Sequence, residues 1–172
     1  MTTEQDMRTH VSDLAVENFK KGLNCCECVY DALIRAGALE VDGATRAMCV
    51  GFGGGIGLTG FTCGALSGEV LANGAMYGRS DPWATPEADR GSEVARKYYR
   101  RYNRIVHDFI ADNGSALCKD ICAPLGDFHD KARRVNCMKL IGRAAAQAYD
   151  YLQIDNEAAF QMPYGENMGG NQ

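Results

Sequence analysis

Apolar residues recur at helical spacing through most of the chain, and no segment shows the alternation expected of a strand. The first apolar stripe predicts a helix that ends near Gly22, and Asn24 is a suitable N-cap for a second helix over residues 25–36. A short element is expected near residues 42–50. The first stripe consists of Met7, Val11, Leu14, Ala15 and Phe19.

A glycine-rich loop, GFGGGIGLTG over residues 51–60, leads into a third predicted helix over residues 63–77. Glycine and alanine make this helix thin and intrinsically weak. Such a composition suits a helix whose backbone another element must approach closely, so we predict a central, tightly enclosed helix. Its small residues are Gly64, Ala65, Ser67, Gly68, Ala72, Gly74 and Ala75.

The second half of the chain begins with a loop, SDPWATP over residues 80–86, which we expect to form a hinge between two helical halves. A long helix is predicted over residues 87–111. A short helix capped by Ser115 should stop near Pro124, because proline disrupts a helix interior. The last predicted helix covers residues 128–152.

Length and composition fit one domain with a substantial core, since the chain has 172 residues and is 46% hydrophobic. We predict an all-α, single-domain helical bundle over residues 1–160, with a central Gly/Ala-rich helix and a mobile C-terminal tail over residues 161–172.

Charge and hydropathy exclude several partners. The net charge is −4 and no long basic run occurs, so nucleic acid is not an expected partner. The longest basic cluster, Lys131, Arg133 and Arg134, is interpreted as an exposed helix face. No window approaches the roughly 18 apolar residues of a membrane span. The polar N-terminus lacks a secretory signal, so a cytoplasmic location is expected if Met1 is the natural start.

Eight cysteines are the main chemical feature of the chain. Cytoplasmic thiols are kept mostly reduced, so a set of this size indicates metal binding or catalysis more than structural disulfides. Cys63 follows the glycine loop at an expected helix start, where free N–H groups and the helix dipole favour a thiolate. The other seven are Cys25, Cys26, Cys28, Cys49, Cys118, Cys122 and Cys137.

The spacing of these cysteines leaves several interpretations open. Cys25 and Cys28 form a C-x-x-C without the βαβ context of a thioredoxin-like pair, so they are either half of a metal site or residues that fill a helix interface. Cys118 and Cys122 share a helix face, and Cys137 lies on an apolar stripe typical of the core. No zinc-finger or ferredoxin spacing occurs, so a four-thiolate site would be assembled from separate helices.

Three other features have simpler interpretations. Gly55, Gly57 and Gly60 satisfy G-x-G-x-x-G, but no strand precedes them, so a dinucleotide site is not expected. His129 is a candidate proton donor or ligand, although a solvated histidine fits the pattern better. Cys49 has no evident companion and is treated as a core residue.

The order of the motifs resembles a known family. A cysteine after Asn24, then GFGGGIG and CGALSG, then two later single cysteines resembles the family of redox-active proteins named C_GCAxxG_C_C. The resemblance covers roughly residues 10–150 and is most specific from FGGGIG to Gly78. The family is similar to helical proteins of anaerobic or facultative microbes and to the iron–sulfur part of split-Soret-type cytochromes.

The resemblance implies that four thiols meet and hold an iron–sulfur cluster. The four positions that match the family pattern are Cys25, Cys63, Cys118 and Cys137. The other cysteines are additional to the pattern, and among them Cys28 or Cys122 could replace a neighbouring ligand.

We therefore expect a small redox protein, an electron carrier or oxidoreductase, whose cluster exchanges electrons with a partner protein. The alternative is metal-free thiol–disulfide chemistry, with Cys63 as the attacking thiolate and Cys25 or Cys137 as the resolving thiol. A structural zinc site in an interaction module is a further alternative, and a helical bundle with incidental cysteines is the last. The Gly-rich helix could also form a homodimer interface.

Overall fold

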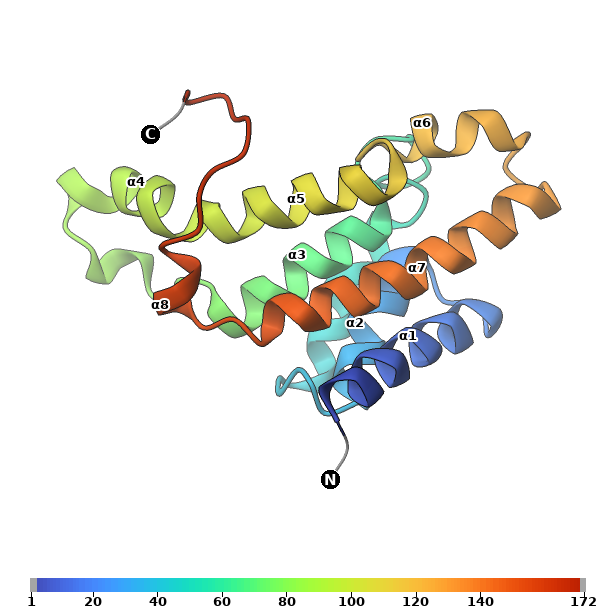
Figure 1. Cartoon of the computed structure of the whole chain (residues 1–172), viewed down its shortest axis with the longest axis horizontal. Helices are drawn as coiled ribbons and strands as arrows, with labels where there is room; N and C mark the ends of the chain where they lie inside the picture. Colours follow the sequence, from blue (N-terminus) through green and yellow to red (C-terminus); the bar gives the residue numbers. More distant parts are fainter. Residues whose placement is uncertain (1–2, 171–172) are drawn as a thin grey trace.

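The computed structural model describes residues 3–170, and within that range it is all-α with a single isolated bridge and no strand (Figure 1). The predicted fold class is confirmed. The α-helices are α1 Glu4–Lys20, α2 Cys25–Arg35, α3 Gly64–Tyr77, α4 Arg90–Glu93, α5 Tyr99–Asn113, α6 Cys118–Cys122, α7 Lys131–Leu152 and α8 Asn156–Ala159. The 3-10 segments are η1 Gly43–Phe52, η2 Pro82–Ala84, η3 Glu87–Asp89 and η5 Ala123–Leu125, and η4 Val94–Tyr98 is a π-helical turn.

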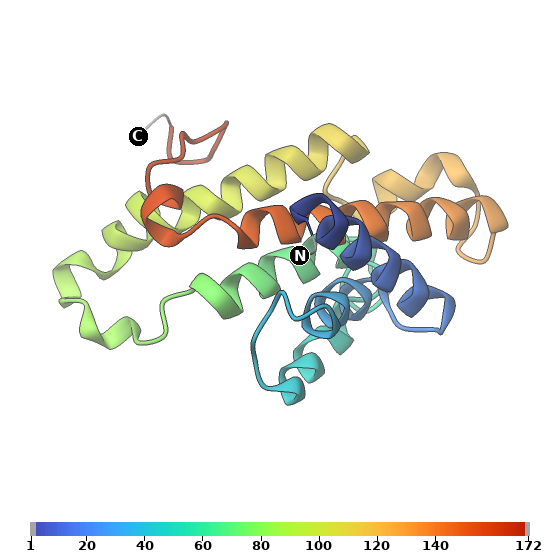
Figure 2. The ribbon, with the colours of Figure 1, turned by 60° about the horizontal axis from the view of Figure 1, so that its bottom comes forward.

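Helix α7 runs through the length of the molecule and packs against α1, α2, α3 and α5. Figures 1 and 2 show the segment around α4 at one end of the molecule and α6, with the first turns of α7, at the other. None of the helices in the described part of the chain is long and apolar enough to cross a bilayer.

The predicted helix starts at residues 25 and 63 agree closely with the structure. Asn24 caps α2 as expected, because its side chain accepts from the N–H groups of Cys26 and Glu27 while the Glu27 carboxylate accepts from the Asn24 N–H. Cys63 is the N-cap of α3, so that helix begins one residue later than predicted.

The prediction of one continuous helix over 87–111 is wrong in its first part. That stretch contains η3, α4 and η4 before α5 begins at Tyr99. The π-helical turn places the Tyr98 ring edge-on against the Phe160 ring, with centroids 5.0 Å apart. This contact, at the end of α8, accompanies the departure from regular α-helical geometry. The predicted loop over 80–86 contains η2.

The described part of the tail, residues 161–170, lies along α5. Arg100 donates to the Met162 carbonyl at 2.8 Å, and the Gly165 N–H donates to Asn103 Oδ1 at 2.8 Å. The tail was expected to be mobile, and its last two residues, 171–172, lie outside the described residues.

Helix α3 is enclosed as predicted, because its glycines touch α2. A Cβ at Gly68 would lie 2.9 Å from the Val29 Cβ and 3.0 Å from the Cys26 carbonyl oxygen. Both distances are shorter than ordinary van der Waals contact, so only glycine permits this approach.

A buried arginine on α5 joins that helix to the carboxyl end of α7. The Arg101 guanidinium is 2% exposed, donates to the carbonyl oxygens of Tyr151 and Ile154 at 2.6 Å each, and lies 4.1 Å from the Tyr77 ring centroid. A cation at the carboxyl end of α7 is stabilised by the helix dipole and by these free carbonyl groups.

Glu69, on α3, is a buried carboxyl with no hydrogen-bond partner for either oxygen. Burial raises its pKa well above the ordinary value, and Asp112 and Asp108 on α5 raise it further. The side chain is therefore expected to be protonated and neutral at neutral pH.

We predict that Gly68→Ala destabilises the protein by about 1–2 kcal/mol, because a methyl group at the α2 contact forces an overpacked core to shift. Gly74→Ala is the matched control on the same helix, since its Cβ would meet only the Tyr102 hydroxyl at 3.6 Å. The control should gain up to about 1 kcal/mol of helix propensity. Urea unfolding of both variants measures the difference, and equal stabilities would contradict the proposed contact.

We also predict that Glu69→Gln flattens the pH dependence of stability. The folded state retains a proton that the unfolded chain releases above about pH 4.3, so the stability of the unmodified protein falls as pH rises through the window between these two pKa values. Glutamine does not titrate, so the variant should gain stability relative to the unmodified protein between about pH 5 and about pH 7.5. The free energy of unfolding in urea is measured for both proteins across this pH range. If the two free energies change with pH in parallel, Glu69 is not protonated in the fold.

Candidate functional site

The glycine loop before α3 folds into a left-handed turn. Five consecutive residues from Gly54 to Leu58 have φ values of 63°, 75°, 63°, 59° and 67°. Two of these, Ile56 and Leu58, carry side chains in a region that costs such residues roughly 1–2 kcal/mol each. Backbone bonds from the Gly57 N–H to the Gly51 carbonyl at 2.9 Å, and within the rest of the loop, offset this cost.

Gly55 allows this loop to lie directly against α6. A Cβ at this position would lie 2.8 Å from the Cys118 Cβ and 2.7 Å from the Phe61 nitrogen. Any other residue would push Cys118 away from the loop, so the glycine run positions a cysteine that is distant in sequence.

A short backbone pairing joins the end of the loop to the start of α6. The Cys63 N–H donates to the Ala116 carbonyl at 2.8 Å, and the Cys118 N–H donates to the Phe61 carbonyl at 2.7 Å. These bonds flank the isolated antiparallel bridge between Thr62 and Leu117. They hold Cys63 and Cys118 side by side at the entrance of their two helices.

The predicted cap of α6 differs slightly from the structure. Ser115 accepts from the Leu117 N–H at 3.0 Å and forms a turn, while Leu117 itself occupies the N-cap position. The helix therefore begins at Cys118, directly after the turn that Ser115 stabilises.

Five cysteines line one cavity of about 250 Å³ at this end of the molecule. They come from α2, the start of α3, both ends of α6 and the middle of α7, and they include all four positions singled out in the sequence together with Cys122. The cavity wall consists of Phe19, Cys25, Gly54, Cys63, Cys118, Ile121, Cys122, Phe128, His129, Arg133, Arg134, Cys137 and Leu140.

Cys122 has the most direct contacts to other thiols in the cavity. Its thiol lies close to those of both Cys118 and Cys137. The Arg133 guanidinium lies near the Cys118 and Cys122 sulfurs, donates to the Phe128 carbonyl at 2.6 Å, and lies 3.8 Å from the Phe128 ring centroid.

The interpretation of the basic cluster as a solvated face is therefore wrong for Arg133. One signal in the sequence could have identified it: Arg133 precedes Cys137 by four residues on one helix, which places both on the same face.

Burial keeps the metal-free thiols protonated. It raises the pKa of Cys63 to about 11, although the N–H groups of Ala65 and Leu66 at the start of α3 act in the opposite direction. It also raises the pKa of Cys137 to about 12, with the nearby Cys122 adding to the effect. The thiolate bias expected for Cys63 from its place at a helix start is thus outweighed by desolvation.

The pKa of Cys25 is also raised by burial. This pKa lies well above the ordinary value, and the nearby Cys63 and Cys137 raise it further because like charges repel. The described residues, 3–170, contain no group of three or more Cys, His, Asp or Glu side chains placed to hold a single metal ion.

The remaining cysteines lie outside this cavity. The Cys28 thiol is buried and donates to the Leu23 carbonyl at 3.4 Å. Cys49 is buried in the core as expected, but it has a companion that the sequence did not reveal, because its thiol lies close to that of Cys26. The segment before the G-x-G-x-x-G is the 3-10 segment η1, so the context of a dinucleotide site is missing there.

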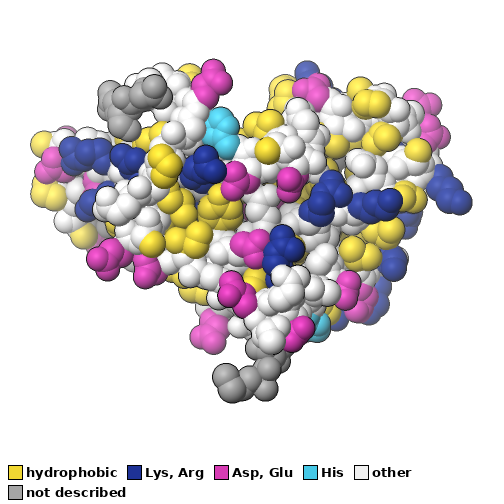
Figure 3. Space-filling model, in the orientation of Figure 1, with side chains coloured by type: hydrophobic (Ala, Val, Ile, Leu, Met, Phe, Trp, Pro, Cys, Tyr) yellow, Lys and Arg dark blue, Asp and Glu magenta, His cyan; other side chains and the backbone are white. Residues whose placement is uncertain are grey.

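The surface around the cavity carries several cations. Lys and Arg side chains follow the right-hand edge of the molecule in Figure 3, beside the first turns of α7. Arg133 and Arg134, on the first turns of α7, form part of the cavity wall itself. A cavity bordered in this way favours an anionic occupant or a negatively charged set of thiolates.

Comparison with known proteins places the chain in a family. No solved structure matches it. A relative described as an uncharacterized protein from Archaeoglobus fulgidus is 28% identical over 130 residues, which cover 76% of this chain and 85% of the relative. Residues 23–151 match the family model described as "Putative redox-active protein (C_GCAxxG_C_C)", although this chain reads Cys63-Gly64-Ala65 where that name has Gly-Cys-Ala. The match spans most of the chain, which therefore belongs to the C_GCAxxG_C_C family.

Proposed function

We propose that the five-thiol cavity binds an iron–sulfur cluster and that the protein carries electrons. The observation that supports this most directly is the convergence of Cys25, Cys63, Cys118 and Cys137, from four separate elements, on one cavity. Cysteine thiolates are the usual ligands of such clusters. When bound, the cluster supplies reversible electron transfer at a potential that its surroundings set.

The donor set and the shape of the cavity fit a cluster better than a single zinc ion. Four thiolates about 2.3 Å from one zinc lie within roughly 4 Å of each other, around a single point. A cluster of several atoms instead requires thiols around a space, and these thiols line one of about 250 Å³.

The protonated state of the free thiols fits the same function. Ligand thiols must lose their protons when metal binds, so uptake of iron releases protons and is disfavoured at low pH. Arg133 offsets part of the negative charge that the thiolates acquire, since it already lies near the Cys118 and Cys122 sulfurs. Hydrogen bonds from such a group to cluster sulfurs raise a reduction potential.

The surface beside the cavity suits contact with another redox protein. The loop that carries Gly54 exposes Ile56 at 45%, Leu58 at 69% and, just after it, Phe61 at 57%. Exposed apolar side chains gathered next to a redox site are typical of a surface that meets a partner. We assign the electron donor or acceptor to this face.

One observation favours a second candidate, metal-free thiol–disulfide chemistry. The Cys122 thiol lies close to those of Cys118 and Cys137, so either pair can form a disulfide while two protons and two electrons pass to an external disulfide. Cys63 is a poor attacking group for this chemistry at neutral pH because its pKa is raised to about 11.

We predict that Cys63→Ser loses most of its iron and sulfide when the protein is produced in iron-replete cells and purified without oxygen. Loss of Cys63 removes the thiolate at the start of α3, and Cys118 and Cys122 share one face of α6, so together they supply one ligand position and do not replace it. Cys28→Ser is the matched control, because Cys28 is buried on α2 but points away from the cavity to the Leu23 carbonyl. Iron and sulfide analysis with a visible spectrum gives the measurement. A Cys63→Ser protein with its full complement of iron would show that Cys63 is not a ligand and that the proposed ligand set is wrong.

We further predict that α6 supplies a ligand that either of its cysteines can provide. Cys118 and Cys122 are four residues apart on one helix, both line the cavity, and their thiols are in contact. Each single serine variant should keep at least part of its iron, whereas Cys118→Ser/Cys122→Ser should keep almost none. Full iron in the double variant would show that α6 is not part of the site.

A further inference from the structure

Two cysteines outside the cavity form a pair of their own. Cys26 and Cys49 are both 0% exposed, and their thiols lie close to each other. Their backbones are held together independently by Asn24. Its Oδ1 accepts from the Cys26 N–H at 3.0 Å, and its Nδ2 donates to the Cys49 carbonyl at 3.4 Å.

A small cavity of about 90 Å³, separate from the five-thiol cavity, reaches Cys49 from the side of α2. This volume equals about three water molecules. Its wall is mostly apolar, with charged side chains among the lining residues, and its volume is enough for water or another molecule of similar size. The wall consists of Leu23, Glu27, Tyr30, Asp31, Arg46 and Cys49.

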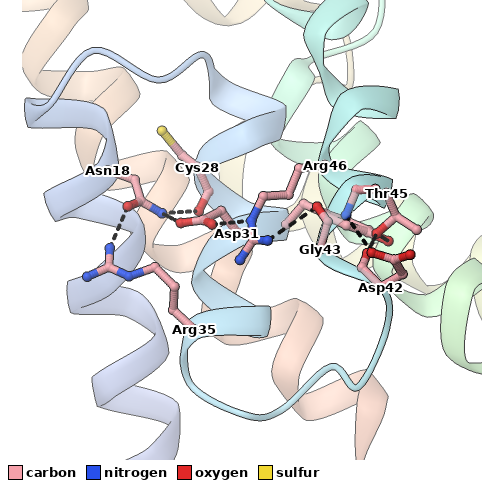
Figure 4. Close-up of polar contacts among 10 residues, drawn as sticks. Asn18, Cys28, Asp31, Arg35, Asp42, Gly43, Thr45 and Arg46 are labelled. Carbon is pink, nitrogen blue, oxygen red and sulfur yellow. Dashed lines mark hydrogen bonds and ion pairs between the residues drawn. The ribbon is translucent and has the colours of Figure 1, made fainter.

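A polar network fixes the wall of this second cavity. Figure 4 shows the Arg46 side chain between Asp31 and the Gly43 carbonyl, with Asn18 on the far side of Asp31. Arg46 Nε donates to Asp31 Oδ1 at 2.5 Å, and Asn18 Nδ2 donates to Asp31 Oδ2 at 2.9 Å. These bonds tie η1 to α2 and α1, so the two thiols are held next to each other by a rigid frame.

We propose that Cys26 and Cys49 form a second redox site, a dithiol that a small hydroperoxide oxidises to a disulfide. Cys49 is the attacking residue, because it lines the small cavity whereas Cys26 does not. Cys26 is the resolving residue, because its thiol already contacts Cys49. The site differs from the family's four cysteine positions, since neither residue is one of them.

The reaction balances without a metal. The Cys49 sulfur attacks one oxygen of hydrogen peroxide, an S–O bond forms, the O–O bond breaks, and the departing hydroxide takes the thiol proton and leaves as water. The Cys26 sulfur then attacks the Cys49 sulfur, an S–S bond forms, and the hydroxyl group leaves with the Cys26 proton as a second water. Two thiols are oxidised, one peroxide is reduced, and an external dithiol returns the pair to its reduced state.

The size of the small cavity determines which oxidants react. A space of about 90 Å³ admits hydrogen peroxide but not a bulky disulfide such as oxidised glutathione. The pair should therefore respond to peroxide and stay reduced in the presence of disulfides that oxidise exposed thiols.

The test is peptide mapping after treatment with hydrogen peroxide. Protein purified without oxygen is treated with one equivalent of peroxide, its free thiols are alkylated, and its iron content is measured in the same sample. Complete tryptic cleavage places Cys26 in peptide 22–35 and Cys49 in peptide 47–79. We expect these two peptides to become joined by a disulfide, and we expect oxidised glutathione not to join them.

Variants identify the pair, because peptide 22–35 also contains Cys25 and peptide 47–79 also contains Cys63. The joined peptide should persist in Cys63→Ser and in Cys28→Ser, and it should be absent in Cys26→Ala and Cys49→Ala, with circular dichroism confirming that each variant folds. Loss of the joined peptide in Cys63→Ser would assign the disulfide to the five-thiol cavity and overturn the proposal. Alkylated Cys26 and Cys49 in peroxide-treated unmodified protein would overturn it even if the alanine variants failed to fold. Neither result depends on whether iron is present.

Discussion

The contact between the backbones of α2 and α3 is the constraint on which the rest of the structure depends. At Gly64 an added Cβ would lie 2.7 Å from the Phe52 carbonyl oxygen and 3.1 Å from the Cys25 Cβ, and Gly68 is equally close to Val29. The helix that begins at Cys63 is therefore pressed against the helix that begins at Cys25. The same contact packs the core and sets the distance between Cys25 and Cys63 in the cavity, so both the fold and the site depend on it.

The period of a helix then explains how neighbouring cysteines on α2 serve two different sites. Successive residues point about 100° apart around a helix axis. Cys25 therefore points into the five-thiol cavity, and Cys26 points to Cys49 on η1. Asn24 sets these two directions, because its capping contacts fix the first turn of α2. Its side-chain amide also donates to the Cys49 and Val50 carbonyls and so holds η1 beside that turn.

Local sequence signals identified most of the long helices, the Asn24 cap and the enclosed α3, because capping and apolar spacing act within a few residues. The same signals could not identify features that depend on distant partners. The π-helical turn follows from contact between Tyr98 and Phe160, and the left-handed loop follows from its fit against Cys118. Spacing could show that Cys118 and Cys122 share a face, but not that Cys122 contacts Cys137 on another helix. The Cys26–Cys49 pair was missed for the same reason.

Burial raises the thiol pKa at both cysteine sites, but a neighbouring thiol reverses the direction at Cys49. In the five-thiol cavity desolvation raises the pKa values of Cys63 and Cys137, so the empty site consists of neutral thiols that cost little to bury. A metal cluster replaces those protons with its own positive charge, and Arg133 compensates for charge that remains. Because the thiols can be buried as neutral groups and ionise only when metal binds, the protein can fold first and take up the cluster afterwards. At Cys49, by contrast, the neighbouring Cys26 thiol lowers the thiol pKa, as an attacking sulfur requires.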